Sequence, residues 1–248
     1  MIELDNIYNM DCLEGMKQIP DGSVDAVICD LPYGTTACAW DSVIPFDKLW
    51  EQYRRICKPN AAIVLFGSEP FSSALRMSNI KDYRYDFTWV KTKAGNFALA
   101  RKNPLKLHEN ILVFYQEFPT YNLWNLHPLP KPVKSSRDKK GANLGHCVDK
   151  GDYYQTETGF HESVLYYSNP SNAGHLHPTQ KPVDLLRYLV LTYTNEGDTV
   201  LDNCMGSGTT AVACIKEKRH FIGFELNKEY YDKANKRIKL EQQQLSLF

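Results

Sequence analysis

The sequence predicts an α/β protein whose core is a buried, mostly parallel β-sheet. Three largely apolar runs of strand length, residues 24–29, 61–66 and 199–202, support this prediction, because strands covered on both faces form nearly continuous apolar stretches. A segment with helical spacing follows each run after a turn, as βαβ units require. The length of 248 residues suits one such domain with a large insertion, or two small domains.

The remaining elements follow in chain order from periodicity and turn residues. Apolar residues at helical spacing between Phe46 and Ile56 predict a helix that stops before Pro59. Aromatic and β-branched residues favour strands at 85–90 and 110–115. In full, we expect extended segments at residues 6–9, 24–29, 61–66, 85–90, 110–115, 199–202 and 220–224, and helices at 13–18, 46–56, 71–77, 183–190, 211–217 and 228–241.

Asp30 follows the first buried strand, and Leu31, Pro32 and Tyr33 lead the chain out of the sheet. Polar residues at the carboxyl end of a buried parallel strand point into the crevice where such sheets bind ligands. A carboxylate and a backbone carbonyl both accept hydrogen bonds from an amino group, and an aromatic ring stacks on a flat heterocycle. These residues are therefore candidates for binding an aminated base. The alternative is a strand followed by an ordinary Pro-Gly turn.

A βαβ unit near the C-terminus has the features of an adenosine site. The strand that ends at Asp202 leads into a glycine-containing loop, and glycines let a ligand approach the backbone closely. Glu225 follows the neighbouring strand, where a carboxylate accepts hydrogen bonds from two ribose hydroxyls. The spacing alone does not separate S-adenosylmethionine from a dinucleotide. The candidate cofactor residues in this unit are Asp202, Gly206, Ser207, Gly208, Thr209, Thr210 and Glu225.

The formal net charge is zero, but the charges are unevenly distributed. Residues 91–150 contain eleven Lys/Arg against four Asp/Glu, which is typical of a localised phosphate-binding face. Within them, the loop 91–102 carries Phe97 among cations, a composition suited to holding a DNA backbone and stacking on a base. The alternative is a solvated surface loop. The candidate DNA contacts are Lys91, Lys93, Phe97, Arg101, Lys102, Lys139 and Lys140.

Residues 117–176 lack regular periodicity. They contain repeated prolines and scattered Tyr, Trp and His side chains, so the segment is too long for a connecting loop and too aromatic for plain disorder. We interpret it as an insertion that recognises the target sequence. The spacing of His146, Cys147, His175 and His177 fits no zinc pattern, and no metal is expected.

Four motifs occur in order along the chain: Asp30-Leu31-Pro32-Tyr33, residues 177–182 (HPTQKP), the Gly206–Gly208 loop, and Glu225. With the first motif upstream of the cofactor loop, this order resembles the permuted arrangement of β-class DNA amino-methyltransferases. The resemblance covers about two thirds of the chain. It implies the methyltransferase variant of the doubly wound, Rossmann-like sheet with helices on both faces, S-adenosylmethionine as methyl donor, and double-stranded DNA as substrate.

The resemblance also implies roles for the first motif. Asp30 and the Leu31 carbonyl accept hydrogen bonds from the amino group of a flipped-out base, Pro32 holds the turn, and Tyr33 stacks on the base. Leu31 departs from the usual second residue, which contributes mainly its carbonyl. An aspartate rather than a serine at position 30 resembles the adenine-N6 enzymes and favours adenine over cytosine N4. A C5-cytosine enzyme needs a Pro-Cys nucleophile, and no cysteine here follows a proline.

Other motifs of the family resemble cofactor contacts. Asp11 and Cys12 resemble the motif beside the cofactor's adenine, although Asp11 also suits the N-cap of a helix. The HPTQKP string implies that Thr179 or Lys181 reaches the methionine end of the cofactor. His108-Glu109 resembles a further family motif, and the sequence gives it no chemical role.

These observations divide the chain into four parts: a catalytic half at 1–116, the insertion at 117–176, a cofactor-binding half at 177–240, and a tail at 241–248. Two alternatives come from other classes. An NAD-dependent oxidoreductase has no use for the Asp30 motif, and only about 40 residues follow Gly208, too few for its catalytic half. A non-catalytic DNA-binding protein retains the basic segment but does not require the adenosine site.

The first five residues have neither a basic n-region nor an apolar h-region, and no apolar run is long enough to span a membrane. Seven cysteines without a CxxC pair are typical of reduced thiols. We therefore expect a cytoplasmic, nucleoid-associated protein. Double-stranded DNA is the expected partner, and a homodimer is a second partner considered.

The final residues carry a separate signal. Gln244-Leu245-Ser246-Leu247-Phe248 resembles the short, extended peptide by which bacterial replication and repair proteins bind the DNA sliding clamp. Gln244, Leu245, Leu247 and Phe248 are the candidate clamp contacts. The alternative is that the three apolar side chains pack back on the domain.

Overall fold

The computed structural model describes residues 2–34, 42–135, 153–169 and 180–245. The chain divides into two compact units, one formed by Met1–Asn122 with Ser163–Phe248 and the other by Leu123–Glu162. The larger unit contains the sheet and every described residue of the candidate cofactor and base sites. The smaller unit lies within the expected insertion, residues 117–176, and is shorter than it at both ends.

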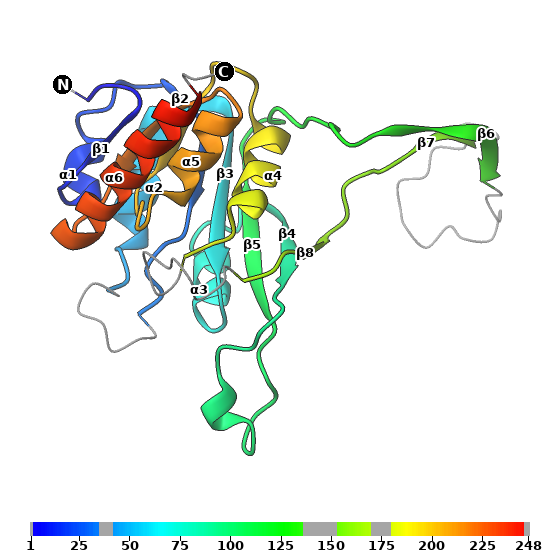
Figure 1. Cartoon of the computed structure of the whole chain (residues 1–248), viewed down its shortest axis with the longest axis horizontal. Helices are drawn as coiled ribbons and strands as arrows, with labels where there is room; N and C mark the ends of the chain where they lie inside the picture. The colour runs from blue at the N-terminus through cyan, green and yellow to red at the C-terminus, as the bar shows by residue number, and fades with distance from the viewer. Residues whose placement is uncertain (1, 35–41, 136–152, 170–179, 246–248) are drawn as a thin grey trace. The chain divides into compact units, whose positions relative to one another are not determined.

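A mixed, mostly parallel sheet forms the core of the larger unit (Figure 1). Its strands are β1 (Asn6–Tyr8), β2 (Val24–Cys29), β3 (Cys57–Gly67), β4 (Tyr83–Val90), β5 (His108–Phe114), β8 (Val164–Tyr166), β9 (Thr199–Asp202) and β10 (His220–Phe224). They are ordered β1-β10-β9-β2-β3-β5-β4-β8. The strands from β1 to β3 in this order run parallel, β5 is antiparallel to both β3 and β4, and β8 is parallel to β4. The predicted α/β fold is confirmed.

The strand order places two strand tips together at the carboxyl edge. β2 and β9 are neighbours, with Val27 opposite Leu201. From β2 the chain continues through α2 (Phe46–Ile56) to β3 on one side, whereas from β9 it continues through α5 (Thr209–Lys216) to β10 on the other. The strand order therefore reverses between β2 and β9, and ligands of open α/β sheets bind in the crevice at such a point.

Helices cover both faces of the sheet, which explains why its strands are apolar. They are α1 (Cys12–Met16), α2 and α3 (Phe71–Ser78) on one face, and α4 (Val183–Tyr193), α5 and α6 (Lys228–Leu245) on the other. Successive residues of β2 alternate between the two resulting cores: Ile28 packs with the α4–α6 side, and Val27 and Cys29 pack with the α1–α3 side. Each face of the sheet is thus buried.

The smaller unit contains an antiparallel pair of strands that the sequence does not predict, β6 (His127–Ser135) and β7 (Tyr153–Thr158). β6 includes Pro128, Pro130 and Pro132. Prolines at every second position lack their N–H groups on the same edge of a strand, so a strand with one unpaired edge tolerates them. Repeated prolines therefore mark an edge strand here.

Two further differences concern the larger unit. The sequence does not predict β8, because three residues are too few for a periodic pattern. α6 continues to Leu245, beyond the expected end at residue 241, so Gln244 and Leu245 are helical rather than part of an extended tail. Among the described residues, none of the helices has both the length and the apolar character needed to cross a membrane.

Candidate active site

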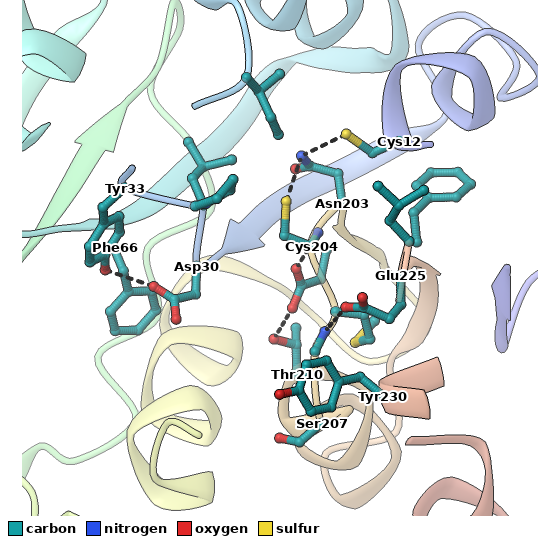
Figure 2. Close-up of a pocket in the computed structure, with 18 of the residues that line it drawn as sticks. Cys12, Asp30, Tyr33, Phe66, Asn203, Cys204, Ser207, Thr210, Glu225 and Tyr230 are labelled. Atoms are coloured by element: carbon teal, nitrogen blue, oxygen red, sulfur yellow. Dashed lines mark hydrogen bonds between the residues drawn. The ribbon is translucent and has the colours of Figure 1, made fainter. Parts of the chain in front are cut away.

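A cavity of about 380 Å³ lies at the carboxyl edge of the sheet. Residues that follow four neighbouring strands line it: Asp11 after β1, Asp30 after β2, Cys204 after β9, and Glu225 after β10. Figure 2 shows Asp30 and Tyr33 on one side of this cavity and Glu225 on the other. The strand order therefore brings the two predicted sites, which are far apart in the sequence, into one continuous pocket.

The motif at residues 30–33 lies at one end of the cavity. The Tyr33 hydroxyl donates to Oδ1 of Asp30 at 2.7 Å, and the Tyr33 ring stacks on Phe71 with centroids 5.0 Å apart. Leu31 and Pro32 both line the cavity, and Leu31 also packs in the α1–α3 core. The chain thus presents a carboxylate and an aromatic ring together at the tip of β2.

Lys181 enters this end of the cavity from the segment before α4. Its side chain is only 8% exposed, and its ammonium contacts Oδ2 of Asp30 and lies 3.5 Å from Oε2 of Glu109. Lys91 contacts the other Glu109 oxygen, Oε1. Two carboxylates and two ammonium groups therefore alternate in a partly buried chain, Asp30–Lys181–Glu109–Lys91.

This arrangement sets the protonation of the group. Burial raises the pKa of Asp30, and the Glu109 charge adds to the rise, while the Lys181 ammonium opposes it. Burial also tends to raise the pKa of Glu109, but Lys181 and Lys91 outweigh it and hold that pKa below its usual range. The pKa of Lys181 is raised, because Asp30 and Glu109 outweigh its burial. Lys181 is therefore a permanent cation between the two carboxylates.

At the other end, Asp202 organises the loop after β9. Its Oδ1 accepts from the Cys204 backbone N–H at 3.1 Å and its Oδ2 from the Thr210 hydroxyl at 2.6 Å. Burial raises the pKa of Asp202 to about 6, although the Thr210 and Cys204 hydrogen bonds oppose the rise. Asp202 and Thr210 line the cavity, and their contact fixes the start of α5.

Glu225 closes the same loop from the tip of β10. Oε2 accepts from the Gly206 N–H at 2.8 Å, and Oε1 accepts from the Asn227 N–H at 2.7 Å. Burial raises its pKa, although these two hydrogen bonds oppose the rise. Ser207 and Thr209 also line the cavity, and their hydroxyls lie 3.1 Å apart. Glu225 therefore has an ordered position beside the glycine loop.

Gly208 has a structural role in the loop before α5. It is not among the described residues that line the cavity. It adopts a left-handed backbone, with φ of 78°, at the N-cap of α5, and a Cβ at this position would lie 3.3 Å from Cβ of Ala234 on α6. The loop therefore needs this glycine for its turn and for helix packing, and the cofactor contact of Gly208 stays a prediction.

Asp11 and Cys12 lie beside this end of the cavity. Asp11 is the N-cap of α1, and its Oδ1 accepts from the N–H groups of Leu13 and Glu14. The Asn203 amide donates weakly to the sulfurs of Cys12 and Cys204, at 3.7 and 3.6 Å. The predicted N-cap and the predicted cavity position of Asp11 therefore coexist.

Several lining residues are ones that the sequence reasoning missed. Phe66 lines the end of the cavity at Asp30, beside Lys181. The Lys181 ammonium lies 5.1 Å from the centroid of the Phe66 ring. Met10, Leu226 and Tyr230 line the Glu225 end. Apolar residues beside a strand-tip carboxylate are the signal that identifies such positions, since an adenine ring needs flat apolar contacts.

The basic loop between β4 and β5 is ordered around Asn96, and Figure 1 shows it extending beyond the ends of those strands. The Asn96 side chain donates to the Pro104 carbonyl at 3.0 Å and accepts from the Lys106 N–H at 2.7 Å. Phe97, in a short 3₁₀ turn (Phe97–Leu99), is 76% exposed, and Lys93, Arg101 and Lys102 are exposed as well. Lys91 is less exposed, and its ammonium forms an ion pair with Glu109, so its DNA contact stays a prediction.

Some predicted residues lie outside the described part of the chain. They are Thr179 in the HPTQKP string, Lys139 and Lys140 in the insertion, the residues His146, Cys147, His175 and His177, and Leu247 and Phe248 in the tail.

Comparison with known proteins agrees with this geometry. The N6_N4_Mtase family model, described as DNA methylase, matches residues 24–236. The type II methyltransferase M.HpaI of Haemophilus parainfluenzae is 29% identical over 93% of this chain and 73% of its own length. M.BglII of Bacillus subtilis is 30% identical over 93% of this chain and 68% of its own length.

Two solved structures resemble the fold. The M1.HpyAVI–SAM complex superposes with a TM-score of 0.63 and 26% identity, covering 94% of this chain and 98% of that one. The cytosine-N4-specific PvuII DNA methyltransferase superposes with a TM-score of 0.70 and 15% identity, covering 99% and 93%.

The doubly wound, mostly parallel sheet is the Rossmann-like fold of the solved DNA methyltransferases that it resembles. The chain belongs to the N6/N4 DNA methylase family and is a DNA methyltransferase. An oxidoreductase and a non-catalytic DNA-binding protein are thereby excluded.

Proposed function

We propose that this protein transfers a methyl group from S-adenosylmethionine to the exocyclic N6 of adenine in duplex DNA. The observation that carries the proposal is that Asp30 and Glu225 line a single cavity from opposite ends. One carboxylate suits an amino group and the other suits a ribose, so the cavity has a polar group for each reactant.

The residues at the Glu225 end fit S-adenosylmethionine. Glu225 supplies a carboxylate acceptor for the ribose hydroxyls, and Met10, Leu226 and Tyr230 supply apolar surface for an adenine. Gly206 leaves its backbone accessible for the rest of the molecule, since it carries no side chain. A relative of similar length, M1.HpyAVI, has been solved with SAM. When bound, S-adenosylmethionine supplies an electrophilic methyl group on a sulfonium sulfur.

At the base end, Asp30 accepts a hydrogen bond from the target amino group and orients its nitrogen lone pair toward the cofactor end. The Leu31 carbonyl accepts the second N–H, Tyr33 stacks on the ring, and Pro32 holds the turn. A base inside a duplex cannot reach this buried position, so it is flipped out of the stack first. The catalytic contribution is mainly positioning and exclusion of water, because direct transfer needs aligned reactants.

The DNA backbone lies against the exposed face of the basic loop in this proposal. Asn96 holds the loop in shape before DNA arrives, so the exposed Phe97 costs little entropy to insert beside the vacated base. Lys93, Arg101 and Lys102 contact phosphates, and residues 117–176, including Lys139 and Lys140, set the target sequence.

Adenine is favoured over cytosine because an aspartate occupies position 30. The test is methylation of duplex DNA with the purified protein, followed by digestion to nucleosides and mass spectrometry. We expect N6-methyladenine as the product. N4-methylcytosine would place the enzyme in the other branch of the family, and no product on any duplex would contradict the proposal.

We further propose that the C-terminal residues bind the bacterial sliding clamp. Gln244 and Leu245 form the last turn of α6, so docking as an extended peptide requires this turn to unwind. A terminal turn frays at low cost. Deletion of residues 244–248 should abolish micromolar clamp binding and leave methylation of short duplexes intact; absence of binding by the full chain at about 100 µM would contradict the proposal.

A further inference from the structure

Glu109 is a buried carboxylate to which the methyl-transfer chemistry gives no role. It is the second residue of β5, and its side chain is 13% exposed. Oε1 is fixed by Lys91. Oε2 is fully buried and accepts no hydrogen bond from the described residues, although the Lys181 ammonium lies 3.5 Å away. A buried anionic oxygen without a hydrogen bond costs free energy, and a second state in which this oxygen is hydrogen-bonded would explain why it is kept.

Lys181 lies between two acceptors and is closer to one of them. Its ammonium contacts Oδ2 of Asp30, while Tyr33 occupies Oδ1. Both oxygens of Asp30 are therefore engaged by protein groups when no base is present. A target amino group competes with Lys181 for Oδ2, because two N–H donors aimed at the same lone-pair region repel each other.

We propose that Glu109 is a positioning residue that takes over the Lys181 ammonium when the target amino group binds Asp30. This movement of the Lys181 ammonium from Asp30 to Glu109, which we call the hand-over, frees Oδ2 of Asp30 for the substrate. It also keeps a positive charge beside Asp30. It rests on the proposed role of Asp30 as acceptor for the target amine.

The geometry makes this hand-over short. The Lys181–Glu109 separation needs to shorten from 3.5 Å to about 2.8 Å, the usual length of a charge-assisted hydrogen bond. Lysine has a flexible four-carbon stem, so such a shift needs no backbone movement. Lys91 binds the other Glu109 oxygen, so Oε2 of Glu109 is already positioned to accept from Lys181. The alternative is that Glu109 only neutralises two lysines.

A shift in the pKa of Asp30 does not by itself distinguish the two roles. The titratable groups around Asp30 are Cys29 and Tyr33 from β2 and its tip, Lys91 from the end of β4, Glu109 from β5, Lys181 before α4, and Asp202 from β9. Glu109→Gln removes a negative charge that raises the pKa of Asp30. The acid limb is the part of the pH profile where the transfer rate falls as the pH drops. It must then move to lower pH, whichever role Glu109 plays.

The test is the maximal transfer rate at pH values above the acid limb, which we call the plateau. Glu109→Gln keeps the shape of the side chain but binds an ammonium weakly, so Lys181 stays on Asp30. We expect single-turnover transfer at saturating DNA and S-adenosylmethionine to fall about tenfold or more, while the cofactor Kd stays near wild type. Glu109→Asp, which keeps the charge, should recover part of the plateau. An unchanged plateau in Glu109→Gln overturns the hand-over.

Lys91→Met tests the network from the opposite side. Without Lys91, Glu109 draws Lys181 away from Asp30 in the DNA-free enzyme, and the acid limb should move to higher pH at subsaturating DNA, where the rate reports the free enzyme. A limb that stays in place or moves to lower pH also overturns the inference. Asp30→Asn separates the two proposals: near-normal turnover in that variant would refute the role of Asp30 itself, whereas lost turnover with a normal Glu109→Gln plateau refutes only the hand-over.

Discussion

The ammonium of Lys181 contacts the Asp30 carboxylate across 151 positions of the chain. Asp30 directly follows β2, and Lys181 lies shortly before α4. A buried pair of this kind is costly to break from one side, because the remaining partner is left as an uncompensated charge. The contact therefore couples the base site to the second half of the fold, and variants at Asp30 must be chosen with Lys181 in mind.

Asp30→Asn should lower methyl transfer by about 10² or more, the scale on which a positioned polar group acts. The amide keeps one acceptor oxygen and the shape of the side chain. It faces away from the Glu225 end of the cavity, so S-adenosylmethionine affinity should stay within a few-fold. The measurements are single-turnover transfer and calorimetric titration of the cofactor.

The pH dependence of transfer by the wild-type enzyme tests the role of Asp30 in a second way. Burial places the pKa of Asp30 above its ordinary value of 3.8. Protonation replaces an acceptor lone pair with an O–H donor, so transfer should fall as the pH drops through this raised pKa. The acid limb should be absent from the small residual activity of Asp30→Asn. A limb that persists there belongs to another group.

Glu225→Ala should weaken S-adenosylmethionine binding about tenfold or more, since a hydrogen bond to a charged group contributes about 1.5–3 kcal/mol. The substitution also frees the N–H groups of Gly206 and Asn227, which loosens the loop. Glu229→Ala is the matched control, because Glu229 is an exposed carboxylate in the first turn of α6 and pairs with Lys233. Equal Kd values for Glu225→Ala and the wild type would place the adenosine elsewhere.

Lys93→Ala and Arg101→Ala should weaken DNA binding and flatten its salt dependence, because each removed phosphate contact lowers the slope of log K against log salt by about 1. Lys239→Ala on α6 is the control for loss of an exposed cation away from the loop. Binding is measured between about 50 and 200 mM salt. Equal slopes in all three variants would mean that the loop is only a solvated surface.

Phe97→Ala should lower transfer without lowering Tm, since the exposed ring makes little contact within the free protein. The expected loss is in the flipping step, so a target placed opposite an abasic site should recover much of the rate. Equal losses on both substrates would assign Phe97 a different role.

Gly208→Ala should destabilise the fold by about 1–2 kcal/mol, because it combines a left-handed backbone with a tight approach to Ala234. Gly197→Ala is the matched control: its φ is 83°, and nothing lies within 4 Å of the added Cβ. The difference in Tm between the two variants isolates the packing contribution. A loss of binding free energy for the cofactor that exceeds the loss of folding stability would support the predicted cofactor contact of Gly208.

The sequence by itself determined the strands whose carboxyl ends carry Asp30, Asp202 and Glu225, and hence which polar side chains face the crevice. These features are local, because a buried apolar run and the turn after it involve consecutive residues. It also identified the glycine loop and the family's motif order. The tertiary structure decided which distant residues meet: Lys181 with Asp30, Glu109 with Lys91, and Gly208 with Ala234. Such contacts depend on strand order and helix packing, which no local pattern specifies.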